Sequence, residues 1–274
     1  MTRTAPSAHE FNTAGGSVSA GGDTAAIIVD VQLGCVKYMS REDCRNYLSA
    51  LGETIEDLRA NQIPVNWVVM GRNDGLVRPE TDKASNEVRP RGELARMGFM
   101  NPDPFNAGDM AKDNEDIFEE FIMAHGPRGN EAVFVKDNYF SAFDSDAFTQ
   151  HLQSNGIKNT VTMGLVGSVC AFETSIGGTQ RGFITNLLLD HVATWAGEGR
   201  DSQLIWREGF NSPEEANTWQ RAEMNLALDK PHRGFTDEQR QAAKQINYTT
   251  YNDFTSSALA PSASPPSPPP PRSP

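Results

Sequence analysis

The sequence of 274 residues contains a series of short, nearly unbroken apolar runs, and stretches with helical spacing of apolar residues separate them. Unbroken runs of this kind are typical of strands in a parallel sheet that is covered on both faces. Their alternation with helices favours right-handed crossovers between parallel strands. We therefore predict an α/β fold, a three-layer sandwich with a mostly parallel sheet of about six strands and helices on both faces. The predicted strands cover residues 24–31, 64–71, 131–136, 160–166, 183–189 and 203–206.

Two of the predicted helices have clear start signals. The sequence SRED resembles a capping box that begins at Ser40. Ser212 is followed by Pro213, a residue that favours the first position of a helix. Gly177 and Gly178 lie within another predicted helix and weaken it by about 1 kcal/mol each relative to alanine, so we expect this helix to pack closely on the sheet. Further helices are predicted at residues 113–124, 144–153 and 236–246.

Composition divides the chain into one folded domain and two tails. Residues 1–23 are polar and rich in Gly, Ser and Thr, and residues 251–274 end in SPPSPPPPRSP. We expect a disordered leader at 1–23, a folded domain at 24–250 and a disordered proline-rich tail at 251–274. Residues 72–112 lack clear periodicity and contain four prolines, so we expect a long loop insertion of the kind that serves as a lid or binding loop. The PxxP spacings of the tail fit weak docking into an SH3-type groove, but a plain solvated tail is the preferred interpretation.

Charge and cysteine content narrow the partners and the compartment. The formal net charge is −12 and the basic residues form no dense block, which argues against nucleic acid and anionic membrane surfaces as partners. Three cysteines without a CxxC pair favour a reducing compartment over a disulfide scaffold. No apolar run approaches the roughly 18 residues of a spanning helix, and residues 1–20 resemble no secretory signal. We therefore predict a cytoplasmic protein.

Three chemically reactive side chains follow the ends of predicted strands. Asp30 lies at the end of the first strand, Lys136 ends the third, and Cys170 comes just after the fourth. Ligands of open parallel sheets bind in the crevice beyond the carboxyl ends of the strands. We therefore expect these three side chains to lie in one crevice.

The position of Cys170 is expected to favour its ionised form. The apolar strand breaks at Gly167 and Ser168, and a helix is predicted to follow, with Ser168 as its N-cap. Unpaired backbone N–H groups and the helix dipole favour negative charge in the first turn. We therefore predict that the Cys170 thiol ionises more readily than a free thiol, whose pKa is about 8.5. The alternative interpretation is a small, buried, inert cysteine.

A carboxylate, an ammonium group and a thiol at one crevice edge suggest nucleophilic catalysis. In this hypothesis Cys170 attacks a polarised carbonyl carbon, and Asp30 takes the thiol proton and passes it to the leaving nitrogen. Lys136 holds the ion pair together and keeps the thiolate populated. The backbone N–H groups of Gly167 and Cys170 form the oxyanion hole. Taken singly, Asp30 also fits a capping or turn carboxylate, and Lys136 a solvated strand end.

Residues near the same strand ends are candidates for the substrate pocket. The guanidinium of Arg72 offers a bidentate fork for a substrate carboxylate or carbonyl, although Arg72 also fits a role as an anchor of the long loop. The aromatic residues after Lys136 fit either a pocket wall or the core. Cys35, five residues after Asp30, is a further candidate to approach the site, although packing is its preferred interpretation. The candidate pocket residues are Gln32, Arg72, Asn73, Tyr139, Phe140 and Phe143.

Three motifs together resemble a known family. They are VDVQ at residues 29–32, VKDNYFSAF at 135–143 and GLVGSVCAF at 164–172. In this order and spacing they are similar to the isochorismatase-like cysteine hydrolases, a superfamily that includes nicotinamidase, N-carbamoylsarcosine amidase and isochorismatase. The resemblance covers residues 24–228 and implies a Rossmann-like hydrolase domain, a homo-oligomer and a small-molecule substrate. It also implies that Asp30, Lys136 and Cys170 are the family's catalytic triad, and that a cis peptide lies at Val166–Gly167.

The sequence departs from the nicotinamidases of this superfamily. Those enzymes have a metal-binding Asp-x-His segment after the second strand, where this chain has GRND at residues 71–74 and no histidine nearby. We therefore predict no metal and no cofactor, and nicotinamide is not the expected substrate. His191 is interpreted as a structural histidine. No histidine pairs with another at a metal-ligand spacing among His9, His125, His151, His191 and His232.

Three functional hypotheses remain open on the sequence. The leading one is a metal-independent hydrolase that cleaves a C–N bond of a small amide or ureido substrate through a thioester on Cys170. The alternative is an isochorismatase, which splits a vinyl ether after protonation by the aspartate and does not strictly need the thiol. A further alternative is a non-catalytic binding or scaffold protein that uses the same fold.

Overall fold

The computed structural model describes residues 22–71, 75–77, 88–100, 114–136, 140–196 and 203–258. Its centre is a twisted sheet with the strand order β3-β4-β2-β1-β5-β6-β7, and β8 pairs with β6. The neighbours from β4 to β6 are parallel, as is the β8 pairing, whereas β3 and β7 are antiparallel to their neighbours. The strands are β1 (Thr24–Val29), β2 (Val65–Met70), β3 (Gly75–Val77), β4 (Ala132–Lys136), β5 (Asn159–Leu165), β6 (Ile184–Ala196), β7 (Gln203–Ile205) and β8 (Asn247–Thr249).

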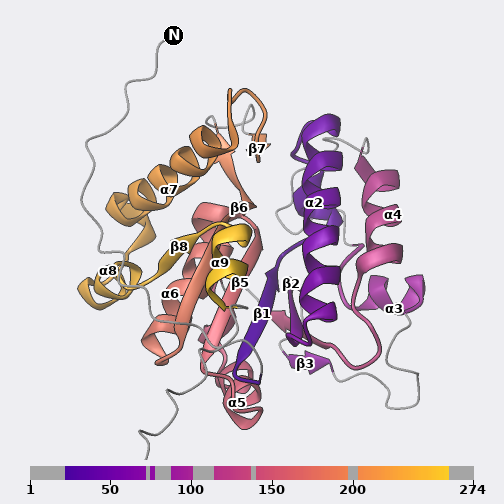
Figure 1. The fold of residues 1–274 in the computed structure, drawn as a ribbon, viewed down its shortest axis with the longest axis horizontal. Helices are drawn as coiled ribbons and strands as arrows, with labels where there is room; N and C mark the ends of the chain where they lie inside the picture. The colour runs from indigo at the N-terminus through magenta and orange to yellow at the C-terminus, as the bar shows by residue number, and fades with distance from the viewer. Residues whose placement is uncertain are drawn as a thin grey trace, which may run out of the picture.

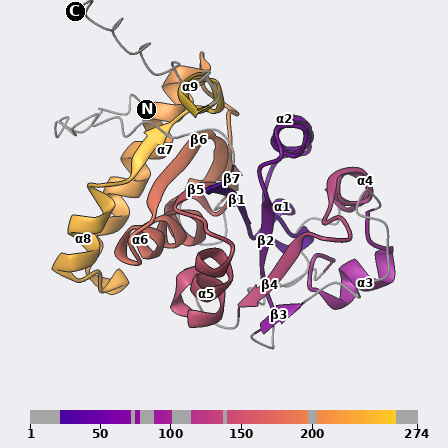
Figure 2. The same ribbon diagram turned by 60° about the horizontal axis from the view of Figure 1, so that its bottom comes forward.

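Helices cover both faces of the sheet, which confirms the predicted three-layer sandwich (Figure 1). Figure 2 shows the two helical layers separated by the strands. One layer contains α1 (Leu33–Val36), α2 (Arg41–Ala60), α3 (Arg91–Arg96), α4 (Glu115–His125) and α9 (Tyr251–Ala258), and the other contains α5 (Asp146–Ser154), α6 (Phe172–Gln180), α7 (Pro213–Asp229) and α8 (Asp237–Ala243).

The sheet separates two hydrophobic cores because successive strand residues point to opposite faces. In β1, Ala26 and Ile28 belong to the core under α2, whereas Ala25, Ile27 and Val29 belong to the core under α6. All five side chains are fully buried. The unbroken apolar sequence of β1 therefore follows from burial on both sides.

The helix start signals are confirmed at atomic detail. Ser40 precedes α2, and its Oγ accepts from the backbone N–H of Asp43 at 3.2 Å. Ser212 precedes α7, and its Oγ accepts from the backbone N–H of Glu215 at 3.2 Å. Each hydroxyl satisfies one of the N–H groups that a helix start leaves unpaired.

The close packing predicted for the paired glycines of α6 is also present. A Cβ added at Gly178 would lie 3.1 Å from Thr185 Oγ1 of β6 and 3.1 Å from the ring of Phe143. A Cβ added at Gly177 would lie 2.5 Å from Ser141 Oγ, so this second glycine faces the segment before α5 rather than the sheet. Glycine therefore allows α6 to approach both neighbours.

Several boundaries differ from the sequence-based expectation. The region 72–112, expected to be a loop insertion, contains β3 and α3. Residues 251–258, expected to belong to the tail, form α9, and Phe254 is 1% exposed in the core. The strand expected at 183–189 continues to Ala196 as β6. Residues 1–21 and 259–274, which include most of the predicted leader and tail, lie outside the described residues.

Gly164 gives a direct test of the packing between β5 and β1. It has a φ of 119°, and a Cβ at this position would lie 2.1 Å from the carbonyl oxygen of Val29. We expect Gly164→Ala to lower the free energy of unfolding by more than about 3 kcal/mol, measured by urea denaturation. Gly182→Ala is the matched control, because Gly182 also has a positive φ of 86° but no heavy atom within 4 Å of the added Cβ. Equal losses in the two variants would contradict this account of the strand contact.

Candidate active site

Asp30 and Lys136 form a buried ion pair at the carboxyl edge of the sheet. Asp30 directly follows β1, Lys136 is the last residue of β4, and β2 lies between these strands. Lys136 Nζ lies 2.7 Å from Asp30 Oδ2, and both side chains are 1% exposed. The backbone of Asp30 is left-handed, with a φ of 48°, a conformation that aspartate adopts more readily than most residues. Two strand ends therefore fix the pair and shield it from water.

The thiol of Cys170 lies close enough to both members of this ion pair for each of them to act on its pKa. Cys170 follows β5, which pairs with β1 on the side opposite β2. Its side chain is 1% exposed. The structure thus brings Asp30, Lys136 and Cys170 together from three strands that are far apart in the sequence.

The turn that carries Cys170 differs in detail from the expectation. Residues Gly167–Ala171 form a π-helical turn that leads directly into α6. The prediction that Ser168 caps the helix was wrong, since Val166 occupies the cap position and the turn has no side-chain cap. The cis peptide lies at Leu165–Val166, one bond before the position that the family resemblance implied. A Cβ on Gly167 would lie 2.3 Å from Thr194 Oγ1 of β6, so glycine is required for this close approach.

The prediction of a readily ionised Cys170 was also wrong. Burial raises the pKa of the Cys170 thiol to about 12, and the negative charge of Asp30 adds to this effect while Lys136 opposes it. A helix terminus stabilises a charge by at most about 2 kcal/mol, which is less than the cost of removing a thiolate from water. The resting thiol is therefore neutral and needs a base when it reacts.

Burial disfavours the charged form of both partners, but the opposing charges outweigh it only for Lys136. Burial raises the pKa of the Asp30 carboxyl, although the ammonium group of Lys136 opposes the shift. For Lys136 burial disfavours the charge, but Asp30 and Cys170 outweigh it and raise its pKa above the ordinary value. Each charge of the pair thus depends on the other.

Titration of Cys170 can test whether its thiol is neutral. We expect the ultraviolet absorbance of a thiolate to be absent for Cys170 between neutral pH and pH about 10, because its pKa is raised to about 12. The measurement is the difference between the titration curves of the wild type and of Cys170→Ala. An ionisation step near the ordinary pKa of about 8.5 in that difference would contradict the burial argument.

The segment after Lys136 supplies a main-chain partner for the ammonium group. Lys136 Nζ donates to the carbonyl oxygen of Phe140 at 2.8 Å. The Phe140 side chain is 44% exposed, whereas Phe143 is 3% exposed and packs against Phe148 and Phe183. The pocket-wall prediction for Phe143 is therefore corrected to its alternative, a core residue. The role of the Phe140 carbonyl was missed because a main-chain acceptor has no sequence signature.

Gln32 has a different role from the predicted one. Its side chain is fully buried and Nε2 donates to the carbonyl oxygens of Met70 and Gly98 at 3.0 and 2.8 Å. Its Oε1 accepts from the backbone N–H of Met70 at 2.8 Å. Since these main-chain contacts occupy both ends of the amide, Gln32 fixes the end of β2 against the segment at Gly98 instead of contacting a substrate.

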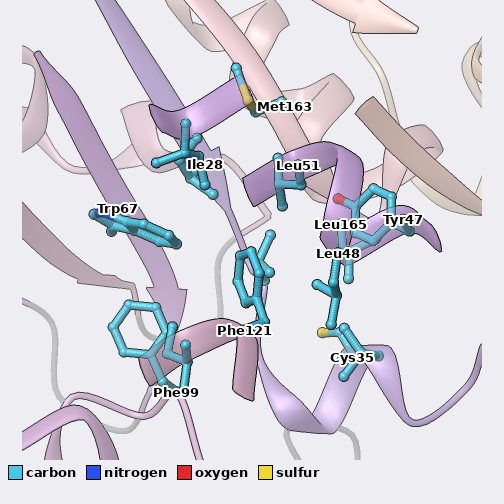
Figure 3. Packing of buried hydrophobic residues seen from close by; sticks show 14 of the residues in the cluster. Ile28, Cys35, Tyr47, Leu48, Leu51, Trp67, Phe99, Phe121, Met163 and Leu165 are labelled. Atoms are coloured by element: carbon cyan, nitrogen blue, oxygen red, sulfur yellow. The ribbon is translucent and has the colours of Figure 1, made fainter. Parts of the chain in front are cut away.

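Three of the predicted pocket residues lie outside the described residues, namely Arg72, Asn73 and Tyr139. Cys35 is fully buried in the core under α2, which agrees with its packing interpretation. It also approaches the site, since the charges of Asp30, Lys136 and Cys170 act on the pKa of its thiol. Figure 3 shows it among apolar side chains that include Leu48.

His191 has structural partners, as predicted. Its Nε2 lies 2.8 Å from Thr54 Oγ1, and its Nδ1 lies 3.0 Å from Asp190 Oδ1. The ring also packs edge to face against Tyr251 of α9. His191 therefore joins β6 to two helices.

Within the described ranges, no group of three or more His, Cys, Asp or Glu side chains is placed to hold a metal ion. Among the helices of those ranges, none is long and apolar enough to span a membrane.

Several solved structures are similar to this chain at low sequence identity, and three of them are described by their names. The YcaC gene product of Escherichia coli, described as an octameric hydrolase of unknown specificity, is 14% identical, with 87% of this chain and 80% of that chain covered and a TM-score of 0.44. A cysteine hydrolase from Pseudomonas syringae pv. phaseolicola 1448A is 17% identical, with coverage of 85% and 91% and a TM-score of 0.46. N-carbamoylsarcosine amidase from Thermoplasma acidophilum is 15% identical, with coverage of 83% and 96% and a TM-score of 0.43. No curated protein matches the sequence.

A family match covers the part of the chain that carries all three residues of the site. The model of the isochorismatase domain matches residues 24–207, more than half of the chain. The chain therefore belongs to the isochorismatase family, and it is a hydrolase. This finding leaves the bond that is cleaved to be assigned.

Proposed function

We propose that this protein is a metal-independent cysteine hydrolase that cleaves a C–N bond of a small amide or ureido substrate through a thioester on Cys170. The observation that carries the proposal is the buried cluster of a thiol, a carboxylate and an ammonium group at one edge of the sheet. A nucleophile within reach of a base whose position is fixed by a third group is the arrangement that covalent catalysis requires.

The first half of the reaction uses the neutral thiol. Asp30 takes the proton from Cys170 as Sγ attacks the carbonyl carbon, so the thiolate forms only as the C–S bond forms. Lys136 stabilises the negative charge on the sulfur during attack. The backbone N–H groups of Gly167 and Cys170 face the oxyanion.

The second half releases both products. The C–N bond breaks as protonated Asp30 gives its proton to the leaving nitrogen, which leaves an acyl group on Cys170. Water then attacks this thioester while Asp30 takes a proton from the water, and the proton returns to the sulfur as the acid product leaves. Asp30 thus moves one proton in each half of the cycle, and Lys136 keeps the carboxylate ionised between the steps.

The absence of a metal from this proposal rests on the sequence. The segment after β2 has GRND at residues 71–74, where a metal-dependent nicotinamidase has an Asp-x-His segment. Nearby histidines are the usual ligands of a catalytic zinc or iron ion. A neutral thiol with its own base needs no metal for activation.

One observation favours isochorismatase activity as the second candidate. Burial raises the pKa of Asp30, and a protonated carboxyl is the group that would protonate a vinyl ether. Isochorismate would then give 2,3-dihydroxy-2,3-dihydrobenzoate and pyruvate. Cys170 has no necessary role in this reaction.

A parallel screen tests the two candidates. Small amides and ureides are assayed for ammonia release, and isochorismate is assayed for pyruvate release. We expect turnover of at least one amide or ureide, and no pyruvate. Pyruvate release without turnover of any amide would replace the first candidate by the second. EDTA should leave the amide turnover unchanged, whereas its loss would contradict the metal-independent chemistry.

We further propose that the chain forms a homo-oligomer and acts on a small molecule in the cytoplasm. The support is the family membership for the first two points and the cysteine content for the third. Light scattering on the purified chain tests the oligomer, since a mass of 30.0 kDa would indicate a monomer.

A further inference from the structure

Arg233 reaches the active-site region from outside the part of the chain that the family match covers. It lies in the 3-10 turn Pro231–Arg233 between α7 and α8, beyond residue 207. Its Nη2 forms an ion pair with Glu173 Oε1, and the two side chains are only 15% and 16% exposed. Glu173 lies on α6, three residues after Cys170, so it sits one helical turn along from the thiol.

The guanidinium of Arg233 also packs on the aromatic ring of Phe140, four residues after Lys136. Its Cζ lies 5.3 Å from the ring centroid of Phe140 and 5.6 Å from that of Phe235. A cation over an aromatic face is attracted to it, more strongly where water is excluded. Phe140 is the residue whose carbonyl oxygen accepts from Lys136 Nζ. One residue therefore contacts Arg233 through its ring and Lys136 through its main chain.

We propose that Arg233 is a positioning residue that holds the Phe140 carbonyl at Lys136 and ties that segment to the turn that carries Cys170. The first link is its contact with the ring of Phe140, and the second is its ion pair with Glu173. Without Arg233 the exposed ring of Phe140 is free to move, and the main chain that fixes Lys136 Nζ moves with it. The inference rests on the proposed function in so far as Lys136 and Cys170 act as a pair.

A purely structural role for Arg233 would affect the stability of the protein and not the reactivity of Cys170. Burial raises the pKa of Glu173, and Arg233 opposes that shift, so Arg233 also stabilises the fold by pairing a buried carboxylate. That role affects the free energy of unfolding and leaves the reactivity of Cys170 unchanged in the protein that remains folded. The test must therefore measure the reactivity of the Cys170 thiol.

The test measures the rate at which iodoacetamide alkylates Cys170, followed by peptide mass spectrometry. Lys136 lowers the pKa of the Cys170 thiol, so displacement of Lys136 reduces the thiolate fraction tenfold for each unit of pKa. We expect Arg233→Met to slow the alkylation about tenfold and Arg233→Lys to slow it less. An unchanged or faster rate in Arg233→Met would overturn the proposal.

Arg181 provides a matched control in the same region. Its Nη1 lies 2.8 Å from Asp146 Oδ1, and its Nη2 donates to the carbonyl oxygen of Phe143 at 3.2 Å. It thus links α6 to the start of α5 by an ion pair and a main-chain contact, but through Phe143 instead of Phe140. We expect Arg181→Met to leave the alkylation rate of Cys170 unchanged. A tenfold loss here as well would show a general effect of removing an arginine and overturn the specific role of Arg233.

A double-mutant cycle tests whether Phe140 is the link. Phe140→Leu keeps the carbonyl that Lys136 uses but removes the ring under Arg233. We expect Arg233→Met to cause no further loss in that background, whereas an undiminished tenfold loss would overturn the link. If Arg233→Met alone does not fold because Glu173 is left unpaired, Arg233→Met/Glu173→Gln removes both charges and is measured in its place. Alkylation requires no substrate, so its outcome is readable even if every amide fails as a substrate.

Discussion

Lys136→Met should lower the free energy of unfolding by about 3–5 kcal/mol and abolish turnover. Removal of one partner from a buried ion pair leaves the other charge uncompensated, and this is the usual cost. Here the remaining charge is Asp30, whose side chain is 1% exposed. Urea denaturation at neutral pH measures the loss. A decrease below about 1 kcal/mol, typical of an exposed pair, would contradict the geometry.

The matched variant is Asp30→Asn/Lys136→Met, which removes both charges. Asparagine tolerates the left-handed backbone of residue 30 as well as aspartate does. We expect the double variant to recover most of the lost stability but no activity, because neither a base nor an ammonium group remains. If it is as unstable as Lys136→Met, the buried charge of Asp30 is not the cause of the loss.

The stability of the Lys136→Met variant should depend on pH through the ionisation of Asp30. Burial raises the pKa of Asp30 above its ordinary value of 3.8, and the effect is larger without the opposing ammonium group. A raised native pKa favours folding at low pH, where the carboxyl is protonated in both states. The stability deficit should therefore be small below pH 3.8 and grow as the pH rises through the native pKa.

Cys170→Ala should lower the turnover of amide or ureido substrates by a factor of about 10⁶, the size of loss that follows removal of a catalytic nucleophile. The reason is that Cys170 is the group proposed to form the acyl intermediate, beside Asp30 and Lys136. Steady-state kinetics measure the loss. Retained cleavage of isochorismate in the same variant would favour vinyl-ether chemistry.

The control for this variant is Cys44→Ala. Cys44 lies on α2 and is fully buried in the core under that helix. Burial raises its pKa to about 12, the value that Cys170 also has. We expect at most a small loss of activity, because the charged groups that act on Cys44 are Asp43, Arg41, Arg45 and Asp116 rather than the pair of Asp30 and Lys136. Equal losses would argue against a nucleophilic role for Cys170.

The parts of the fold that local sequence patterns determine were predicted well. The strands that supply Asp30 and Lys136 are unbroken apolar runs, and their carboxyl ends coincide with the charged residues. The parts that depend on distant contacts were not predicted. Strand β8 has three half-buried residues and is defined only by its pairing with β6. Helix α9 has the core residue Phe254, which shows no local pattern because its contacts come from elements much earlier in the chain.

Some features of the candidate site could likewise be predicted from the sequence, and others depend on distant contacts. The convergence of three reactive side chains follows from the topology of a parallel sheet, which the sequence indicates. The pKa of Cys170 does not follow from the topology, because it depends on how completely the folded protein excludes water from the thiol. The role of Gln32 depends on main-chain groups 38 and 66 residues away. Arg233 acts through contacts with Phe140 and Glu173 that no sequence spacing indicates.

A rapid-quench experiment tests the central claim most directly. The enzyme is mixed with a substrate that it turns over, quenched in acid within one turnover, and analysed as intact protein and as peptides. The account predicts a mass increase equal to the acyl part of the substrate on the peptide that contains Cys170, and its disappearance once the substrate is consumed. Turnover with Cys170 unmodified at every quench time, or an acyl group on a different residue, would contradict it.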